Sequence, residues 1–521
     1  MNFKRKLWWA QHRIDVYKYS MIVLLTLIVP ISIIYFTYSK FSSSNEMTMY
    51  ETTVEPFIKN DYFIASYIDG EWSNEIPGKN DGYAVDKIVC DNGAVGTWDN
   101  DKWAITIENA TKKIKCGVYF KQIYKDNVIA EAPELAQGMI PVKFDSSGNV
   151  VVADTATKWY DYSNHEWANA VLVNCADSAI KSKYFDSNNK VLASAVGKTI
   201  SMDEIMQMYV YIPRYKYQLF NAEDGTSVEQ AINITFESKT TAKSTGTKNG
   251  EWLTHPAFTF GDKELAGIWV GKFETSNTST LPKIVPNASS LRSMNVSAQF
   301  NTSRLMTTTL ASTYGTSIND DSHMMKNMEW GAVAYLSSSI YGRYANASTC
   351  ISSGCEVWIN NNENYTTGCA GSSVSASSAS TCNAWNTATG VNASTTGNIY
   401  GIYDMSGGAW EYVMGNYNDT IGYTEFSSMP EAKYYDKYTG TDSQDDFTKY
   451  HLGDATKETL KSAGKNAWYG DYSSSVYSSG PWVIRGGLYY YGTEAGVFSF
   501  SAYNGNSYID YSSFRVAFSA L

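Results

Sequence analysis

The pattern of hydrophobic and polar positions divides the chain into one long apolar stretch near its start and a remainder in which short apolar runs alternate with polar turns. Residues 21–38 carry no charge and as a helix would span about 27 Å, close to the thickness of a bilayer's hydrocarbon core. Basic residues precede the stretch and acidic ones follow residue 40. We therefore predict a cytoplasmic basic tail over 1–20, a single transmembrane helix over 21–38 and an extracellular remainder. The alternative is a cleaved signal peptide, but the stretch is long for one and no A-x-A-like site follows.

The rest of the chain is typical of β-rich domains. Residues 46–130 hold β-branched and aromatic runs broken by Gly, Asn and Asp, which predicts a small β-rich stalk domain. Residues 132–200 have a mixed pattern, which we interpret as a linker or an elaboration of the next domain. A helix is predicted to begin at Ser201, where a Ser cap precedes an acidic turn, and another within 322–342, where apolar residues recur at three- and four-residue steps.

Composition limits the classes of function. The 521 residues are 43% hydrophobic and 18% charged, and they include 40 Tyr, so the chain is globular and long enough for at least two units. The net charge is −11, and no basic stripe follows the first 20 residues, so nucleic acid is not a predicted partner. The five His lie far apart without metal-ligand spacing, which argues against a His-based metalloenzyme.

The seven cysteines predict disulfides, which are the default outside the membrane. Cys175 lies in an apolar run and is predicted to be a buried thiol. No C-x-x-C pair is present to support a zinc site. The last four cysteines allow three connectivities, and the shortest loops favour one of them. The predicted bridges are Cys90–Cys116, Cys350–Cys355 and Cys369–Cys382.

Six segments of the second half carry a more specific signal. They are YVYIPRYKY (209–217), GIWVGKFETS (267–276), NMEWGAVAYL (327–336), NIYGIYDMSGGAWEYV (398–413), WVIRGG (482–487) and SFRVAF (513–518). In this order they resemble the formylglycine-generating-enzyme-like (sulfatase-modifying factor) branch of the C-type-lectin-like fold. The resemblance implies an α+β, C-type-lectin-like head over 201–521. Within it we expect Trp410 to fill the core, and Glu411 and Arg485 to form a buried, hydrogen-bonded pair with a structural role.

The chemistry of the family does not transfer to this chain. Its sulfatase-activating enzymes use cysteines downstream of the R-G-G motif, and this chain has none after Cys382. The His cluster of the related iron enzymes is also missing. Calcium sites of the family use an Asn in the segment where this chain has Ser406, Gly407 and Gly408, so calcium binding is disfavoured. We therefore predict no catalytic residue, cofactor or metal.

The segment between the R-G-G and F-R-V motifs, residues 488–513, has six Tyr set among Ser, Gly, Asn and Asp. This composition is typical of antibody paratopes, because Tyr supplies large, rigid contact area while Ser, Gly and Asn supply adaptable hydrogen bonds. The arrangement resembles the variable proteins of diversity-generating retroelements, in which adenine-directed mutagenesis rewrites a terminal lectin-like segment. The resemblance implies that fixed flanks hold the residues that face the ligand.

Codon arithmetic tests this interpretation. Mutation of both adenines in an AAC or AAT codon never yields Lys, Glu, Gln, Met or Trp, which make up 96 of the 521 residues. In proportion, a window of 26 residues would hold about five of them, whereas 488–513 holds only Glu494. The residues predicted to contact the ligand are Tyr489, Tyr490, Tyr491, Ser499, Ser501, Tyr503, Asn504, Asn506, Ser507, Tyr508, Asp510 and Tyr511.

The sequence thus predicts a membrane-anchored, surface-displayed protein of bacterial or prophage origin whose diversified segment binds a protein or glycan ligand. Two alternatives remain open. One is an extracytoplasmic enzyme of the same fold with a non-standard site, and the other is an invariant envelope adhesin.

Overall fold

The chain forms two compact units, Met1–Ile123 and Tyr124–Leu521, which are described separately. The computed structural model describes residues 62–68, 71–78, 83–99, 102–108, 114–122, 130–223, 225–351, 354–462, 466–507 and 510–520. The predicted tail over 1–20 and the predicted transmembrane helix over 21–38 lie outside these residues. None of the helices within the described ranges has the length and apolar character that a membrane span needs.

The first unit is a small β domain. Its strands are β1 (Tyr62–Ile68), β2 (Glu71–Ser73), β3 (Tyr83–Cys90), β4 (Val95–Asp99), β5 (Ala104–Glu108) and β6 (Ile114–Gln122). Four of them form a sheet in the order β2-β1-β6-β3, and β4 pairs with β5 as a hairpin. Cys90 and Cys116 lie directly opposite each other on β3 and β6 and form a disulfide at the base of that hairpin.

The second unit is built on a seven-stranded sheet in the order β19-β31-β16-β10-β9-β7-β8. Its strands are β7 (Ile140–Phe144), β8 (Val150–Val152), β9 (Asn169–Val173), β10 (Ile205–Pro213), β16 (Gly267–Gly271), β19 (Asp321–Met324) and β31 (Val516–Ser519). Strands β7, β8 and β9 come from the segment 132–200, so this segment extends the sheet of the second unit.

The helix predicted to begin at Ser201 is wrong. Residues 202–204 form a turn, and the chain continues as β10, which pairs with β9 on one side and β16 on the other. All nine residues of β10 are buried. The Ser cap and the acidic turn are local cues for a helix. Here tertiary packing overrides them, because it buries both faces of β10 as a central strand of the sheet.

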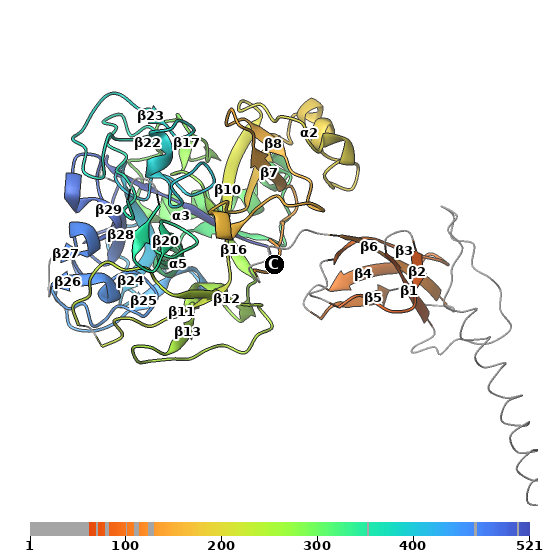
Figure 1. Cartoon of the computed structure of the whole chain (residues 1–521), viewed down its shortest axis with the longest axis horizontal. Coiled ribbons are helices and arrows are strands. Elements are labelled where there is room, and N and C mark those ends of the chain that lie inside the picture. The colour runs from red at the N-terminus through yellow and green to blue at the C-terminus, as the bar shows by residue number, and fades with distance from the viewer. Residues whose placement is uncertain are drawn as a thin grey trace, which may run out of the picture. The chain divides into compact units, whose positions relative to one another are not determined.

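A second, five-stranded sheet carries the C-terminal segment. It consists of β24 (Trp410–Tyr417), β25 (Asp436–Tyr438), β28 (Trp482–Gly486), β29 (Gly496–Tyr503) and β30 (Ser512–Phe514). The order is β25-β24-β28-β29, and β30 pairs in parallel with β24. In Figure 1 the strands β24, β25, β28 and β29 lie on the side of the unit opposite β7 and β8.

Helix α5 (Asn327–Ser337) packs in the core of the second unit, and all of its residues are buried. It confirms the helix predicted within 322–342, although the first residues of that range belong to β19. Trp330 of α5 donates from its indole nitrogen to the carbonyl of Val497 at 2.8 Å. A side chain at Gly331 would collide with the carbonyl of Gly453, because a Cβ there would lie 1.9 Å from that oxygen.

The remaining helices and ladders are short. The helices are α2 (Ser178–Tyr184), α3 (Val296–Arg304) and α4 (Ala311–Tyr314), and a three-stranded sheet is formed by β11 (Tyr215–Gln218), β12 (Ile234–Phe236) and β13 (Trp252–Thr254). Two-stranded ladders are β14 (Thr259–Phe260) with β15 (Lys263–Glu264), β17 (Ser276–Thr278) with β18 (Leu281–Lys283), β20 (Tyr344–Asn346) with β21 (Thr349–Cys350), β22 (Cys369–Ala370) with β23 (Asn383–Ala384), and β26 (Leu460–Ser462) with β27 (Asn466–Ala467). The fold is therefore mostly β with few helices, which is consistent with a C-type-lectin-like fold.

The six sequence motifs come together in this core. Three of them supply β10, β16 and β31, which are neighbours in the seven-stranded sheet. Three supply β24, β28 and β30 of the five-stranded sheet, the motif 513–518 contributing to both β30 and β31, and the sixth motif forms α5. The Cys350–Cys355 and Cys369–Cys382 bridges form as predicted, and Cys175 is a buried free thiol.

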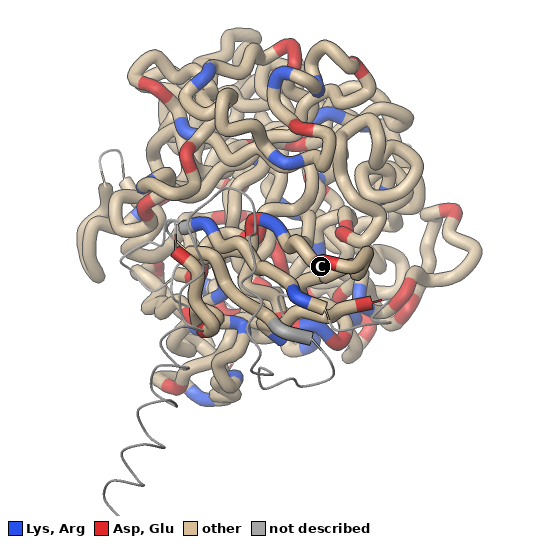
Figure 2. The backbone as a smooth tube through the Cα atoms, turned by 90° about the vertical axis from the view of Figure 1, so that its right-hand side faces the viewer, with Lys and Arg blue, Asp and Glu red and all other residues tan. Residues whose placement is uncertain are grey.

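In the described residues seen in Figure 2, charged positions do not gather into a basic surface. Figure 2 shows Lys and Arg interspersed with Asp and Glu along the described backbone, and no continuous basic band crosses that view.

A buried charged network joins β19 to α5. His323 is fully buried, and its two ring nitrogens lie 2.8 Å from Asp321 Oδ1 and 2.9 Å from Glu329 Oε1. Arg304 and Tyr434 also donate to Asp321, at 2.6 and 2.8 Å. Burial alone would lower the pKa of His323, but the charges of Glu329 and Asp321 and their hydrogen bonds outweigh it and raise the pKa to about 9. The imidazolium is therefore the stable form at neutral pH.

This network predicts a pH-dependent stability. Because the folded-state pKa of His323 lies above the ordinary histidine value of 6.5, the stabilisation from its charge is complete below about pH 6.5 and is lost as the pH rises through about 9. Between pH 6.5 and 9 the free energy of unfolding of the wild type should fall by on the order of 3 kcal/mol more than that of the His323→Gln variant. Urea unfolding followed by tryptophan fluorescence at each pH measures the difference, and parallel pH profiles would contradict the assignment.

Candidate functional site

Two buried arginines flank the tyrosine-rich segment. Arg515, between β30 and β31, donates to both carboxylate oxygens of Glu411 at 2.5 and 3.1 Å. It also donates to the carbonyls of Gly271 at 2.8 Å and Tyr403 at 2.9 Å. Arg485, at the end of β28, donates to the carbonyl of Ala455 at 3.1 Å. Both guanidinium groups are fully buried, so the segment between them is fixed at each end.

The predicted pair of Glu411 with Arg485 is therefore wrong. The two residues are opposite each other on β24 and β28, but the carboxylate of Glu411 is occupied by the two hydrogen bonds from Arg515. The Arg485 guanidinium instead packs against the rings of Trp330 and Phe500, with centroids 5.4 and 5.5 Å from Cζ. A bidentate Arg–carboxylate pair is stronger than a single contact, which explains the choice of partner.

Two further buried carboxyl groups lie close to Glu411. Glu274 accepts from the backbone N–H of Ala409 at 3.0 Å, and Asp404 accepts from the side chain of Asn360 at 2.9 Å. Burial and the neighbouring carboxylates raise the pKa of Glu274 well above its usual value, and burial raises the pKa of Glu411 to about 7. Among the described residues, no three or more His, Cys, Asp and Glu side chains are arranged to hold a metal ion.

Glycines bring the loop before β24 against this cluster. Gly407 and Gly408 have φ values of 74° and 69°, a conformation that favours glycine. A Cβ at Gly408 would lie 2.6 Å from Glu274 Oε1. Trp410 follows directly and is buried, as predicted.

A row of aromatic rings runs from this loop to the protein surface. Successive ring centroids are 5.9, 5.0, 4.9 and 5.0 Å apart, and the interplanar angles lie between 80° and 83°. The guanidinium of Arg292 lies over the last ring, 3.8 Å from its centroid. We call this row the tyrosine ladder, and its members are Trp410, Tyr491, Tyr490, Tyr489 and Tyr365.

The geometry of the ladder suits it to contact another molecule. Edge-to-face contacts restrict each ring, so little side-chain entropy is left to lose on binding. Tyr490 is 52% exposed in spite of contacts with both neighbouring rings. The backbone N–H of Tyr489 donates to the carbonyl of Gly408 at 2.9 Å, which fixes the row to the glycine loop.

Residues of the loop before β30 also lie close to the tyrosine ladder. Burial, and then a hydrogen bond with Tyr503, raise the pKa of Tyr511, and Tyr490 and Tyr491 are close enough to contribute. The carbonyl of Tyr511 accepts from the backbone N–H of Trp410 at 3.0 Å. Arg292 donates to the carbonyl of Asp510, so the cation at the end of the ladder also holds this loop.

The structure brings together half of the residues predicted to contact a ligand, namely Tyr489, Tyr490, Tyr491, Tyr503, Asp510 and Tyr511. Ser499 is wrong as an exposed residue, because β29 is paired with β28 and the Ser499 side chain is 0% exposed. Ser501 is half-buried on the same strand. Asn504, Asn506 and Ser507 are half-buried in the following loop, where the carbonyl of Asn504 accepts from the N–H of Tyr423. Tyr508 lies outside the described residues.

Sequence reasoning missed Arg292 and Tyr365. Tyr365 has a φ of 53°, which is unusual for an aromatic residue, and its carbonyl is held by the N–H of Ser290 at 3.0 Å. Strained backbone of this kind tends to mark functional positions. Both residues lie far upstream of the segment 488–513, and only the fold brings them to it.

Comparison with known proteins adds little. No protein-family model matches the sequence, and no curated protein matches it. Among solved structures, the Major Tropism Determinant M1 variant matches at 12% identity and a TM-score of 0.25, over 82% of this chain and 94% of that chain. Treponema denticola variable protein 1 matches at 12% identity and a TM-score of 0.17, over 68% and 95%. Similarity at these TM-scores does not by itself establish a shared fold.

The ladder predicts different costs for its buried end, Trp410, and for its exposed middle ring, Tyr490. Trp410→Ala should lower the free energy of unfolding by about 3–5 kcal/mol, because it leaves a cavity in the core. Tyr490→Ala removes an exposed ring and should cost about 1 kcal/mol or less. Urea unfolding of the two variants measures both values. A large loss for Tyr490→Ala would show that this ring serves the core and not the surface.

Proposed function

We propose that this chain is a membrane-anchored, surface-displayed binding protein whose C-type-lectin-like head, of the formylglycine-generating-enzyme type, recognises a protein or glycan ligand through the tyrosine ladder and residues 504–507, 510 and 511. The observation that supports this most directly is the ordered row of aromatic rings, which brings Tyr490 to the surface at 52% exposure. Residues of this kind dominate binding energies at interfaces, because each ring buries a large area and is already ordered.

Diversification is part of the proposal. The buried guanidinium groups of Arg485 and Arg515 belong to the two flanks, so exchange of exposed residues between them leaves the core contacts intact. Within the segment, β29 contributes buried residues such as Ser499 and Phe500, which should stay constant. The exposed or half-buried residues of the two loops are the positions at which adenine-directed changes are tolerated.

The proposed location is the cell surface, with the N-terminus in the cytoplasm. Three disulfides in the described residues support export, because such bonds persist in oxidising compartments. The apolar stretch 21–38 supplies the proposed anchor. The β domain of the first unit then serves as a stalk for the head.

The diversification proposal predicts a feature of the gene's surroundings. A near-copy of codons 485–518 that differs only at adenines should lie close to the gene, beside a reverse-transcriptase gene. Sequencing of the locus and of sister strains tests this. Differences should fall in the codons of Tyr489, Tyr490 and Tyr511 and spare that of Ser499. An invariant segment without any such repeat would exclude diversification and leave only the binding role.

The binding role predicts a loss that depends on position. The full-length protein, screened on arrays of extracellular proteins and glycans, should give a ligand whose affinity falls about 10- to 100-fold in Tyr490→Ala. Ile318→Ala is the control, because this large apolar side chain is 76% exposed and lies outside the segment 488–513. Equal binding by both variants would contradict the proposal.

A further inference from the structure

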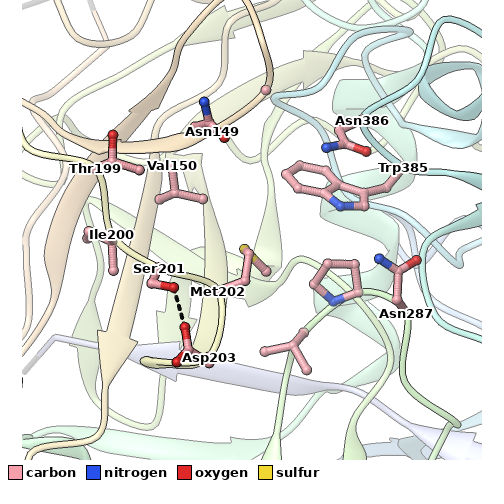
Figure 3. Close-up of a pocket in the computed structure, with 13 residues that line it drawn as sticks. Asn149, Val150, Thr199, Ile200, Ser201, Met202, Asp203, Asn287, Trp385 and Asn386 are labelled. Atoms are coloured by element: carbon pink, nitrogen blue, oxygen red, sulfur yellow. Dashed lines mark hydrogen bonds between the residues drawn. The ribbon is translucent and has the colours of Figure 1, made fainter.

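A cavity of 720 Å³ lies in the second unit, and none of its lining residues belongs to the ladder. It is formed where the turn after β7, the segment 199–203, the segment 285–287 and the residues after β23 meet. Figure 3 shows Trp385, Asn386 and Asn287 on one side of the space and Thr199, Ile200 and Ser201 on the other. The volume falls within the range of about 300–1,000 Å³ that is typical of small-molecule sites.

The lining combines a buried apolar floor with a polar rim. Val150, Ile200, Pro286 and Trp385 are buried, and the indole of Trp385 is fixed by edge-to-face contacts with neighbouring rings, the nearest being Phe144 at 5.5 Å. The floor is therefore rigid. The exposed rim carries side-chain amides and hydroxyl groups.

Two rim amides are free to bind a ligand. Asn287 has a φ of 58°, and its backbone N–H donates to the carbonyl of Thr367 at 2.9 Å, so its position is fixed by the backbone. Within the described residues the side-chain amides of Asn287 and Asn386 make no hydrogen bond. Gly148 allows the turn after β7 to approach Asn386, because a Cβ there would already lie 3.2 Å from Asn386 Cβ.

The charge of the lining narrows the class of ligand. No Lys or Arg lines the cavity. The hydrogen bond from Ser201 is the main cause that lowers the pKa of Asp203, so this carboxylate is ionised. A phosphate, sulfate or carboxylate ligand would meet the negative charge of Asp203 and no lining cation, because Lys183 and Lys283, which also lower the pKa of Asp203, lie outside the lining. Amides and a carboxylate around an apolar floor match a neutral molecule with many hydroxyl groups and apolar C–H faces.

We propose that this cavity is a binding site for a neutral saccharide, separate from the tyrosine ladder. Asn287 and Asn386 each offer an N–H donor and a carbonyl acceptor to adjacent hydroxyl groups, and Asp203 accepts from a third. The apolar floor contacts the C–H face of the sugar ring. The site shares no residue with the ladder, so the inference does not rest on the proposed function.

The test is a glycan array probed with the full-length protein, followed by calorimetry with the oligosaccharides that bind. The protein should be kept in a detergent without a sugar headgroup, because such a headgroup would compete. Neutral oligosaccharides should bind and their sulfated counterparts should not. Asn386→Ala and Asn287→Gly should each weaken binding about tenfold, because each removes hydrogen bonds to the ligand. Glycine is chosen at 287 because it adopts positive φ without strain.

Two controls make the result decisive. Asn188→Ala removes an exposed asparagine elsewhere in the unit, and Tyr490→Ala alters the ladder. Both should bind the saccharide as the wild type does. The proposal is overturned if no neutral oligosaccharide binds at concentrations up to about 10 mM. It is also overturned if binding survives in both cavity variants, or if it is lost only in Tyr490→Ala, which would place the sugar on the ladder.

Discussion

The second unit depends on one buried cation. The guanidinium of Arg515 is fully buried and makes hydrogen bonds to Glu411 of β24, to Gly271 at the end of β16 and to Tyr403 in the loop before β24. It therefore ties the last strands of the chain to both sheets. Removal of one member of such a pair leaves the other charge buried and unpaired, which typically costs about 3–5 kcal/mol. The pair of Arg515 with Glu411 holds the C-terminal end of the binding segment in place.

The arrangement of the surface follows from this constraint. Arg485 fixes the other flank through carbonyl groups and ring contacts, so the chain between the two arginines leaves the core and returns to it at fixed points. Strand β29 lies between the two arginines in the sequence and pairs with β28, and the loops on either side of it carry exposed or half-buried residues. The flanks and β29 thus belong to the buried core, whereas the loops carry the residues of the proposed recognition surface.

The sequence predicted those features that depend on local cues. The spacing of the cysteines was enough to predict the three disulfides. The period of the apolar residues was enough to predict α5, and the composition of the segment 488–513 was enough to single out the tyrosines of 489–491. It did not predict features that depend on distant neighbours. The partner of Glu411 is decided by a parallel pairing of β30 with β24, and β10 is a strand because it lies between two others. Ser499 is buried because β29 pairs with β28. Arg292 and Tyr365 approach the segment 488–513 only through the fold, so the local sequence does not indicate it.

The fixed part of the recognition surface is held by backbone hydrogen bonds. The segment 285–292 pairs with 365–367 through Asn287 to Thr367 at 2.9 Å, Thr367 to Ala288 at 2.8 Å and Ser290 to Tyr365 at 3.0 Å. These bonds place Arg292 and Tyr365 beside the segment 488–513 without support from its side chains. Exchange of residues in that segment would alter the ladder but leave its last ring and the cation in position. A surface built in this way keeps a constant anchor while its remaining contacts change.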